Sequence, residues 1–257
     1  MQYLLICLAA FFTAALTLFS GFGLGTVLLP VFALFFPLPI AIALTAVVHL
    51  LNNLFKLGLL GKFAEPAVIW RFGGPAILAA FLGARLLIWL GALEPLAAYH
   101  FLGHSYLIMP LNLIVSSLMV VFALFELVPG LQRISFGKRY LPIGGFLSGF
   151  FGGLSGYQGA LRSLFLLKCG LSKEGFIATG VAIACLVDLS RLFVYSLDYF
   201  WAALAQNRLT LLAAVLAAFA GSFCGNLLLK QVTLPSIRVL ISLTILVIAL
   251  GLAGGLI

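Results

Sequence analysis

The chain has 257 residues, of which 64% are apolar and only 8% are charged. An ordinary soluble domain carries about 25% charged residues, so this composition excludes a soluble globular protein. In a membrane protein the net charge of +8 reports orientation before it reports a partner, and it does not indicate nucleic-acid binding. The composition therefore predicts an all-α polytopic membrane protein.

Apolar runs between charged or proline-rich breaks predict the membrane segments in chain order. In the first half of the chain they cover residues 2–20, 22–36, 38–60, 66–92 and 107–128. In the second half they cover residues 142–154, 158–170, 174–197, 208–230 and 235–257. A membrane-spanning helix needs about 20 residues, so the longer segments predict full crossings.

Two pairs of these segments predict bent helical hairpins. Residues 2–36 form one apolar stretch, which is too long for a single span of about 20 residues and is interrupted by the glycine-rich run 20–25. Residues 142–170 repeat this arrangement. Glycine permits a sharp break in a helix. The predicted break positions are Gly21, Gly23, Gly25, Gly156 and Gly159.

The basic residues lie in only some of the links. The link 129–141 carries Arg133, Lys138 and Arg139, whereas the link 93–106 has no Lys or Arg. The other basic links lie near 61–66, 168–174 and 230–238. Cytoplasmic loops are enriched in Lys and Arg, so we place the basic links inside. This requires each hairpin to return to the side from which it entered, and it places both termini outside.

Each half then contains one bent or re-entrant hairpin and three transmembrane helices. An odd number of crossings makes the two halves opposite in orientation, as in transporters built from inverted-topology repeats. We expect a single transport domain over residues 1–257. Repeat 1 covers about residues 1–128, the basic cytoplasmic link covers 129–141, and repeat 2 covers about 142–257.

Short sequence matches support this internal duplication. One shift along the chain places the run 20–22, Ser-Gly-Phe, on the run 155–157, Ser-Gly-Tyr. The same shift places Asn53 and Lys56 on Asp188 and Arg191. A slightly larger shift, which implies an insertion or a deletion, places the small residues 79 and 83 on 221 and 225. Small residues spaced four apart let helix backbones approach closely.

Polar side chains inside the apolar segments mark the candidate site, because they are costly in hydrocarbon and face a bundle interior or a wet cavity. The segment 38–60 carries a polar stripe, and the matching segment 174–197 carries an acid–base pair three residues apart. Two interpretations remain open for Lys56, which either faces the cavity or snorkels to the surface. The candidates for coupling or for an ion pair are Asp188 and His49.

The predicted cavity is positive. Half-helices that start near Thr26 and Ala160 would point the positive ends of their dipoles inward. Together with nearby cations, these helix starts suit a compact oxyanion. For Arg162 the alternatives to a bound anion are backbone carbonyls or Asp188. The candidate substrate-binding residues are Arg162, Arg191, Gln158, Ser155, Asn53, Lys56, Ser20 and Thr26.

The glycine motifs resemble a known family. Residues 21–30, Gly-Phe-Gly-Leu-Gly-Thr-Val-Leu-Leu-Pro, with Pro39 and then 43–46, Ala-Leu-Thr-Ala, resemble the first repeat of the TauE/SafE sulfite exporter family. Residues 152–159, Gly-Gly-Leu-Ser-Gly-Tyr-Gln-Gly, followed by 170–174 and 178–181, resemble its second repeat. The resemblance implies a permease of the bacterial inner membrane for small sulfur-containing or organic anions. The chain departs from the family pattern over residues 158–163, Gln-Gly-Ala-Leu-Arg-Ser, where family members often have a glycine cluster leading to a proline.

Other functions remain as alternatives. Gly153-Leu-Ser155-Gly156 is a GxSG string, and His49 with Asn53 gives an HxxxN string, as in an intramembrane serine protease. A passive anion channel would share the same cavity. His100 and His104 could hold a metal if the link were helical, but an interfacial pair is the preferred interpretation.

We expect no enzyme activity, metal or cofactor. The expected partners are a small anion, the lipid bilayer and a coupling proton. A homo-oligomer is compatible with the sequence, and no nucleic acid is expected.

Overall fold

The computed structural model describes residues 2–20, 24–101, 103–132, 134–197, 200–227 and 235–257. The helices of the first half are α1 (Gln2–Ser20), α2 (Leu24–Ala33), α3 (Leu38–Leu60), η1 (Gly61–Phe63), α4 (Pro66–Gly91) and α5 (Pro110–Leu127). A link with α6 (Pro129–Gln132) and η2 (Lys138–Tyr140) follows. The helices of the second half are α7 (Leu141–Ser155), α8 (Gly159–Leu166), α9 (Lys173–Ser196), α10 (Phe200–Gln206), α11 (Arg208–Leu227) and α12 (Pro235–Ala253).

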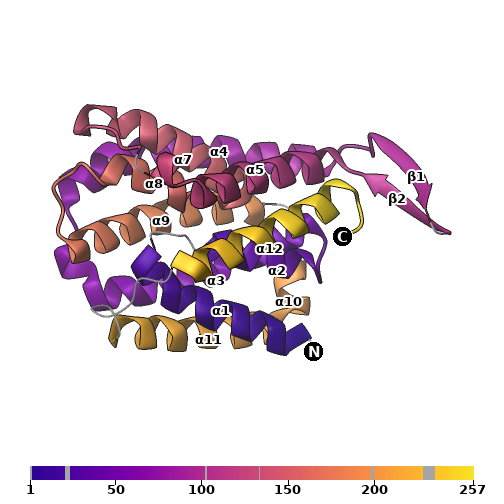
Figure 1. Ribbon diagram of the computed structural model, residues 1–257, viewed down its shortest axis with the longest axis horizontal. Coiled ribbons are helices and arrows are strands. Elements are labelled where there is room, and N and C mark those ends of the chain that lie inside the picture. Colours follow the sequence, from indigo (N-terminus) through magenta and orange to yellow (C-terminus); the bar gives the residue numbers. More distant parts are fainter. Residues whose placement is uncertain (1, 21–23, 102, 133, 198–199, 228–234) are drawn as a thin grey trace.

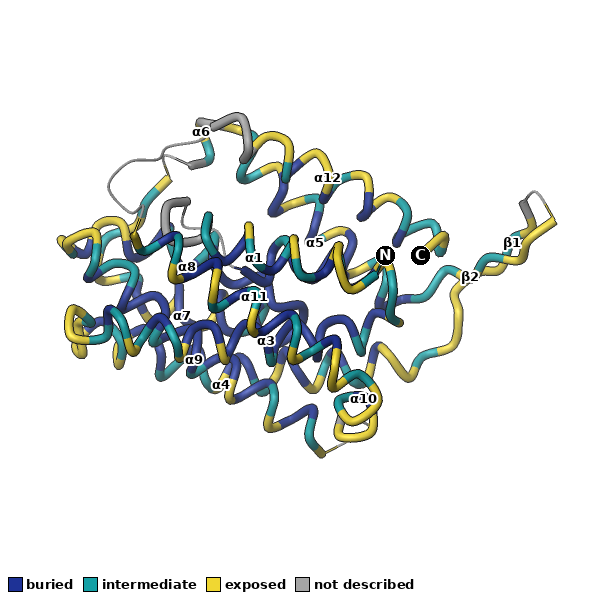
Figure 2. Tube along the Cα trace, turned by 90° about the horizontal axis from the view of Figure 1, so that it is seen from below, coloured by how far each residue is buried: buried dark blue, intermediate teal, exposed yellow. Residues whose placement is uncertain are grey.

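Five helices in the described part of the chain are long and apolar enough to cross a membrane. They are α3 together with η1, α4, α5, α9 and α11. Their outer faces are apolar as well, since Leu78 on α4 is 68% exposed and Leu212 on α11 is 57% exposed. Figure 2 shows the buried residues inside the bundle and the exposed ones around it. Soluble proteins rarely expose apolar surface on this scale, so the predicted all-α polytopic membrane fold is confirmed.

The two hairpins start from opposite ends of the bundle. Both chain termini lie toward the end that carries the β1–β2 hairpin (Figure 1). The start of α1 and the end of α2 meet there, because Gln2, Tyr3, Phe35 and Phe36 line one pocket. At the other end, the Phe136 amide, ahead of α7, donates to the carbonyl oxygen of Leu164 on α8 at 2.9 Å. Each hairpin therefore returns to the end from which it started.

Several corresponding helix boundaries in the two halves are separated by the same offset along the chain. Helices α1 and α7 end at Ser20 and Ser155. The offset between these two ends also separates the starts of α2 and α8, and those of α3 and α9. Helices α4 and α11 begin at Pro66 and Arg208, with a slightly larger offset. These two offsets equal the two shifts that align the sequence motifs.

Close packing pairs helices from different halves. Helix α4 lies along α7, and a Cβ added to Gly145, Gly149 or Gly153 of α7 would clash with a main-chain carbonyl of α4. Helix α1 lies along α11, where Gly221 meets the carbonyl of Phe11 in the same way. Helices α3 and α9 pack together in the centre, and α5 packs on α12. Because glycine has no side chain, the two backbones can touch at these positions.

The link after α4 differs from the prediction. Residues 97–108 form an antiparallel hairpin of β1 (Ala97–Phe101) and β2 (His104–Ile108). Gly103 turns the chain with a positive φ of 78°, a conformation that glycine adopts without strain. His100 and His104 lie on paired strands, so the helix that a metal-binding pair would require at this position does not form. Helix α5 consequently begins at Pro110 and not at 107.

Candidate functional site

The tips of the two hairpins meet inside the bundle. Helix α7 ends at Ser155, Gly156 turns the chain with a φ of +84°, and α8 begins at Gly159. The hydroxyl group of Tyr157 donates a hydrogen bond to the carbonyl of Thr26 in the first turn of α2, at 3.3 Å. The Tyr157 ring is stacked on Phe122 of α5. The chain thus brings the starts of two short helices to the same place.

Asp188 is the centre of a buried polar cluster between α3, α8 and α9. One carboxylate oxygen lies 2.6 Å from Nδ1 of His49. The other accepts hydrogen bonds from Nε of Arg191 at 3.0 Å and from the amide nitrogen of Gln158 at 3.2 Å. Asp188 and Arg191 are both 0% exposed. Because a buried charge is costly unless it is paired and hydrogen-bonded, these bonds hold α3, α8 and α9 together.

Arg191 has donor capacity that Asp188 does not use. Its Nη2 atom lies 2.8 Å from the Asp188 carboxylate, but Nη1 has no hydrogen-bond partner among the described residues. A Cβ added to Gly156 would stand 2.7 Å from Nη1. The guanidinium therefore lies directly against the backbone of the second hairpin tip, where only glycine leaves room for it.

Arg162 and Lys56 add two more basic side chains. Nη1 of Arg162 donates a long hydrogen bond of 3.4 Å to the side-chain oxygen of Gln158, which is neutral. Lys56 is 4% exposed and is subject to charge repulsion from Arg162. Its burial contradicts the snorkelling alternative. Gly180 on α9 makes room for Arg162, since a Cβ there would stand 3.2 Å from Nε of the arginine.

The cluster contains more positive than negative charge. Lys56, Arg162 and Arg191 are basic, and Asp188 is the one carboxylate near them among the described residues. Ionisable groups within a membrane usually pair with each other or mark the path of an ion or a substrate. The excess of cations makes the arrangement chemically suited to a small anion.

The remaining predicted residues differ in how they meet this cluster. Asn53 donates to Nε2 of His49 at 3.3 Å, because Nδ1 carries the hydrogen that faces Asp188. Ser155 donates to the Phe151 carbonyl at 3.0 Å and shapes the tip of the hairpin. Thr26 is 7% exposed at the start of α2. The side chain of Ser20, and Gly21 and Gly23, lie outside the described residues.

Sequence reasoning missed several supporting residues. The Ser148 hydroxyl donates to the main-chain carbonyl of Gln158 at 3.0 Å and secures the start of α8. Asn52 belongs to the predicted polar stripe, but its partner was not predicted: it accepts a hydrogen bond of 2.7 Å from Ser222 of α11. Gly180 belongs to one of the glycine motifs, but nothing in the sequence pairs it with Arg162. These contacts depend on how the helices pack, which single-chain periodicity does not report.

The geometry does not favour a serine nucleophile. The Ser155 hydroxyl gives its proton to a main-chain carbonyl, and His49 is engaged with Asp188 and Asn53. A nucleophilic serine needs a base within hydrogen-bond reach. No Ser155–His49 hydrogen bond occurs within the described part of the chain.

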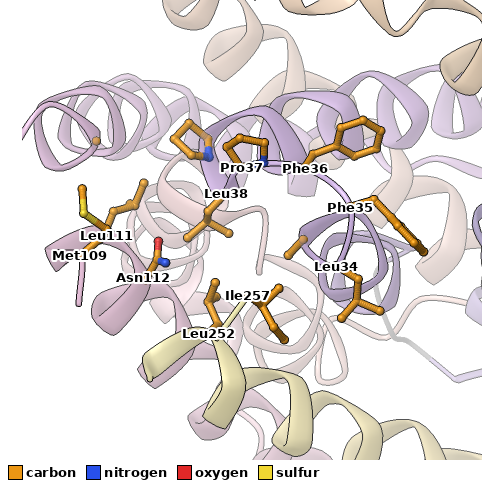
Figure 3. Close-up of a pocket in the computed structure, with 13 residues that line it drawn as sticks. Leu34, Phe35, Phe36, Pro37, Leu38, Met109, Leu111, Asn112, Leu252 and Ile257 are labelled. Atoms are coloured by element: carbon orange, nitrogen blue, oxygen red, sulfur yellow. The ribbon is translucent and has the colours of Figure 1, made fainter. Parts of the chain in front are cut away.

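A separate cavity of about 560 Å³ opens at the end of the bundle that carries the β-hairpin. Figure 3 shows its wall, in which the Asn112 amide lies among apolar side chains. The wall is formed by the α2–α3 turn and by residues near the start of α5 and the end of α12. The C-terminal end of helix α2 therefore lies at this cavity, and the N-terminal end of the same helix lies at the hairpin tips.

Comparison with protein families gives a match over nearly the whole chain. The model of the family described as sulfite exporter TauE/SafE matches residues 6–252. The chain belongs to this family. Neither the search of curated proteins nor the search of solved structures found a match. Membership confirms the predicted resemblance and assigns the chain to a family of membrane transporters.

Proposed function

We propose that this TauE/SafE family member transports a small anion, such as a sulfur oxyanion, a sulfonate or a related organic anion. The observation that carries the proposal is the guanidinium of Arg191. It is fully buried, its Nη1 atom has no partner among the described residues, and it lies against the hairpin tip. An anion bound there would supply the missing acceptor and offset the excess of cations.

The hairpin tips support an anion site. Helix α2 starts beside the tip at Gly156, where α7 ends, and α8 starts three residues later. The first N–H groups of a helix have no partner within the helix, and the dipole makes that end positive. Arg191, Arg162 and Lys56 provide charge. Gln158 and Asn53 provide amide donors, and Ser155, Ser20 and Thr26 belong to the hairpin tips or to their edges.

The arrangement of the two halves supports alternating access. The offset shared by several helix boundaries, and the hairpins that start from opposite ends of the bundle, favour repeats of inverted topology. In such transporters the site lies between the repeats, near broken helices, and opens alternately to the two sides. We place repeat 1 at about residues 1–128 and repeat 2 at about 142–257. The basic link between them is cytoplasmic, both termini are outside, and the membrane is the bacterial inner membrane.

His49 and Asp188 are the proposed coupling pair. In the empty site Asp188 holds both Arg191 and His49. A bound anion competes with Asp188 for Arg191, and the freed carboxylate oxygen then accepts a proton more readily, because an opposite charge has moved away from it. Anion and proton would thus occupy the site together.

Binding to the purified protein tests the site. The panel contains sulfite, sulfate, thiosulfate, a sulfonate and a carboxylate, and the readout is thermal unfolding. An anion at 100 times its dissociation constant stabilises the native state by about 2.7 kcal/mol. We expect Arg162→Ala to lose this stabilisation. Arg85→Ala is the control, because Arg85 is an exposed arginine on α4. An equal shift in wild type and Arg162→Ala, or none with any anion, would overturn the assignment.

Flux into proteoliposomes distinguishes a carrier from a passive channel. A carrier accumulates labelled sulfite transiently when unlabelled sulfite is trapped inside, because the loaded site exchanges faster than it returns empty. A channel equilibrates the label without this overshoot. We expect the overshoot.

A further inference from the structure

We infer that the moving parts of this transporter are two rigid bodies, each assembled from both halves of the chain. Body A consists of α1, α2, α3 and α11, and body B consists of α4, α7, α8 and α9. The inference rests on the proposed transport function, since it names the parts whose movement would open the anion site.

The first step of the argument is the packing within each body. In body B the backbones of α4 and α7 touch at successive turns, where Gly149 meets the carbonyl of Ala76 and Gly153 meets that of Ala80. In body A, Gly221 of α11 meets the carbonyl of Phe11 of α1. Interfaces with backbone in contact cannot slide by one residue without a clash, because side chains cannot make room.

Further contacts extend each body. In body A, Phe55 of α3 stacks on Phe219 of α11, with ring centroids 4.8 Å apart, and Asn52 bonds to Ser222. In body B, Phe81 of α4 packs edge-on against Phe193 of α9. The Tyr195 hydroxyl of α9 bonds to the Gly153 carbonyl of α7. These contacts attach α3 to α11, and α9 to α4 and α7.

The contacts between the bodies are of a different kind. Helices α3 and α9 pack along an extensive seam, but no described glycine of either helix would place a Cβ within 3 Å of the other helix's backbone, so side chains make the contact. His49 of body A bonds to Asp188 of body B, and Thr26 of body A accepts a bond from Tyr157 of body B. The seam therefore contains the same groups that a bound anion or a proton would rearrange. Helices α5 and α12 pack on each other; α5 also contacts α4 and α8 of body B, and α12 contacts α2 of body A.

Paired cysteines test this assignment of parts. The four native cysteines, Cys7, Cys169, Cys185 and Cys224, are first replaced by alanine. The seam pair is Leu60→Cys with Ala178→Cys, whose side chains share one buried cluster at the end of α3, beyond Lys56. The control pair within body B is Gly73→Cys with Leu186→Cys, since a Cβ at position 73 would stand 2.9 Å from Leu186. Each pair is bridged by a short, reducible bifunctional thiol reagent, and sulfite flux is measured.

We expect the bridged seam pair to lose at least nine-tenths of its sulfite flux and to recover it after reduction. The bridged control pair should retain at least half. Full flux in the bridged seam pair, or loss of flux in the bridged control, would overturn the two-body assignment. If the reduced variants and the wild type carry no anion of the panel, the proposed transport function fails instead.

A measurement of spin-label distances tests the two-body assignment without a measurement of sulfite flux. Spin labels on exposed positions report across the seam, with Leu54→Cys of α3 and Leu189→Cys of α9, and within body B, with Leu78→Cys of α4 and Leu189→Cys. In proteoliposomes we expect two distance populations across the seam and one within body B. A single population across the seam, or two within body B, would contradict the proposal.

Discussion

Tyr157 of the second hairpin and Thr26 of the first are joined by a hydrogen bond, although they lie in opposite halves of the chain. The bond runs from the phenol to a main-chain carbonyl, so it does not depend on the identity of residue 26. It joins the two hairpin tips at the place where the proposed bodies meet. Removing it should therefore affect transport more than stability.

The phenol is tested by Tyr157→Phe. The ring keeps its stacking on Phe122, and the loss of one hydrogen bond destabilises the protein by about 1 kcal/mol. We expect altered sulfite flux together with this small loss of unfolding free energy. The matched control is Tyr99→Phe, which removes a 2.7 Å bond to the Gly254 carbonyl far from the tips. Equal effects of the two variants on flux would argue against a role for the tip contact.

The helix contact between α4 and α7 is tested by Gly149→Ala. The added Cβ would clash with the backbone of Ala76, and overpacking of this kind costs about 1–3 kcal/mol or more. The control is Gly74→Ala on α4, where nothing lies within 4 Å of the new Cβ. This substitution should raise the free energy of unfolding by about 0.5–1 kcal/mol, because alanine loses less backbone freedom than glycine on folding. Thermal unfolding in detergent measures both, and equal melting temperatures would refute the close contact.

The acid at the centre of the site is tested by Asp188→Asn. Breaking a buried ion pair leaves Arg191 unpaired, which costs about 3–5 kcal/mol. We expect a lower free energy of unfolding and a sulfite flux that no longer changes with pH. The double variant Asp188→Asn with Arg191→Gln restores charge balance and should recover stability but not flux. Wild-type flux of Asp188→Asn at every pH would remove the proton role.

The orientation is tested by labelling single cysteines in intact cells. Ser135→Cys lies in the basic link, and Ser105→Cys lies on the β-hairpin at the opposite end. An impermeant maleimide added outside should label position 105 and should reach position 135 only after the cells are opened. Labelling of position 135 in intact cells would reverse the orientation.

Helix positions were predictable because they depend on local composition. The glycine run near 152–159 marked the turn between α7 and α8, and the prolines at 110 and 235 coincide with helix starts. The strands at 97–108 were not predicted. Their alternation is short, and both strands lie at the end of the bundle, where burial imposes no pattern.

The residues of the candidate site were more predictable from the sequence than the hydrogen bonds between them. Asp188 and Arg191 lie three residues apart on one helix, so their pairing follows from helical spacing. The bond from His49 to Asp188 depends on the packing of α3 against α9, which the sequence does not encode locally. Burial of Lys56 has the same origin, because a position near a helix end faces either lipid headgroups or a neighbouring helix.

The pairing of α1 with α11 bears on the order in which the protein is built. Helix α1 is synthesised well before α11, and the two backbones touch at Gly221, so the contact surface of α1 stays incomplete until α11 has been made. Helix α4 likewise waits for α7. A chain that stops after the first half would leave both surfaces open to lipid or to another nascent chain, and we expect quality-control proteases to remove it. Each half of the chain therefore needs the other half to complete the packing of its own helices.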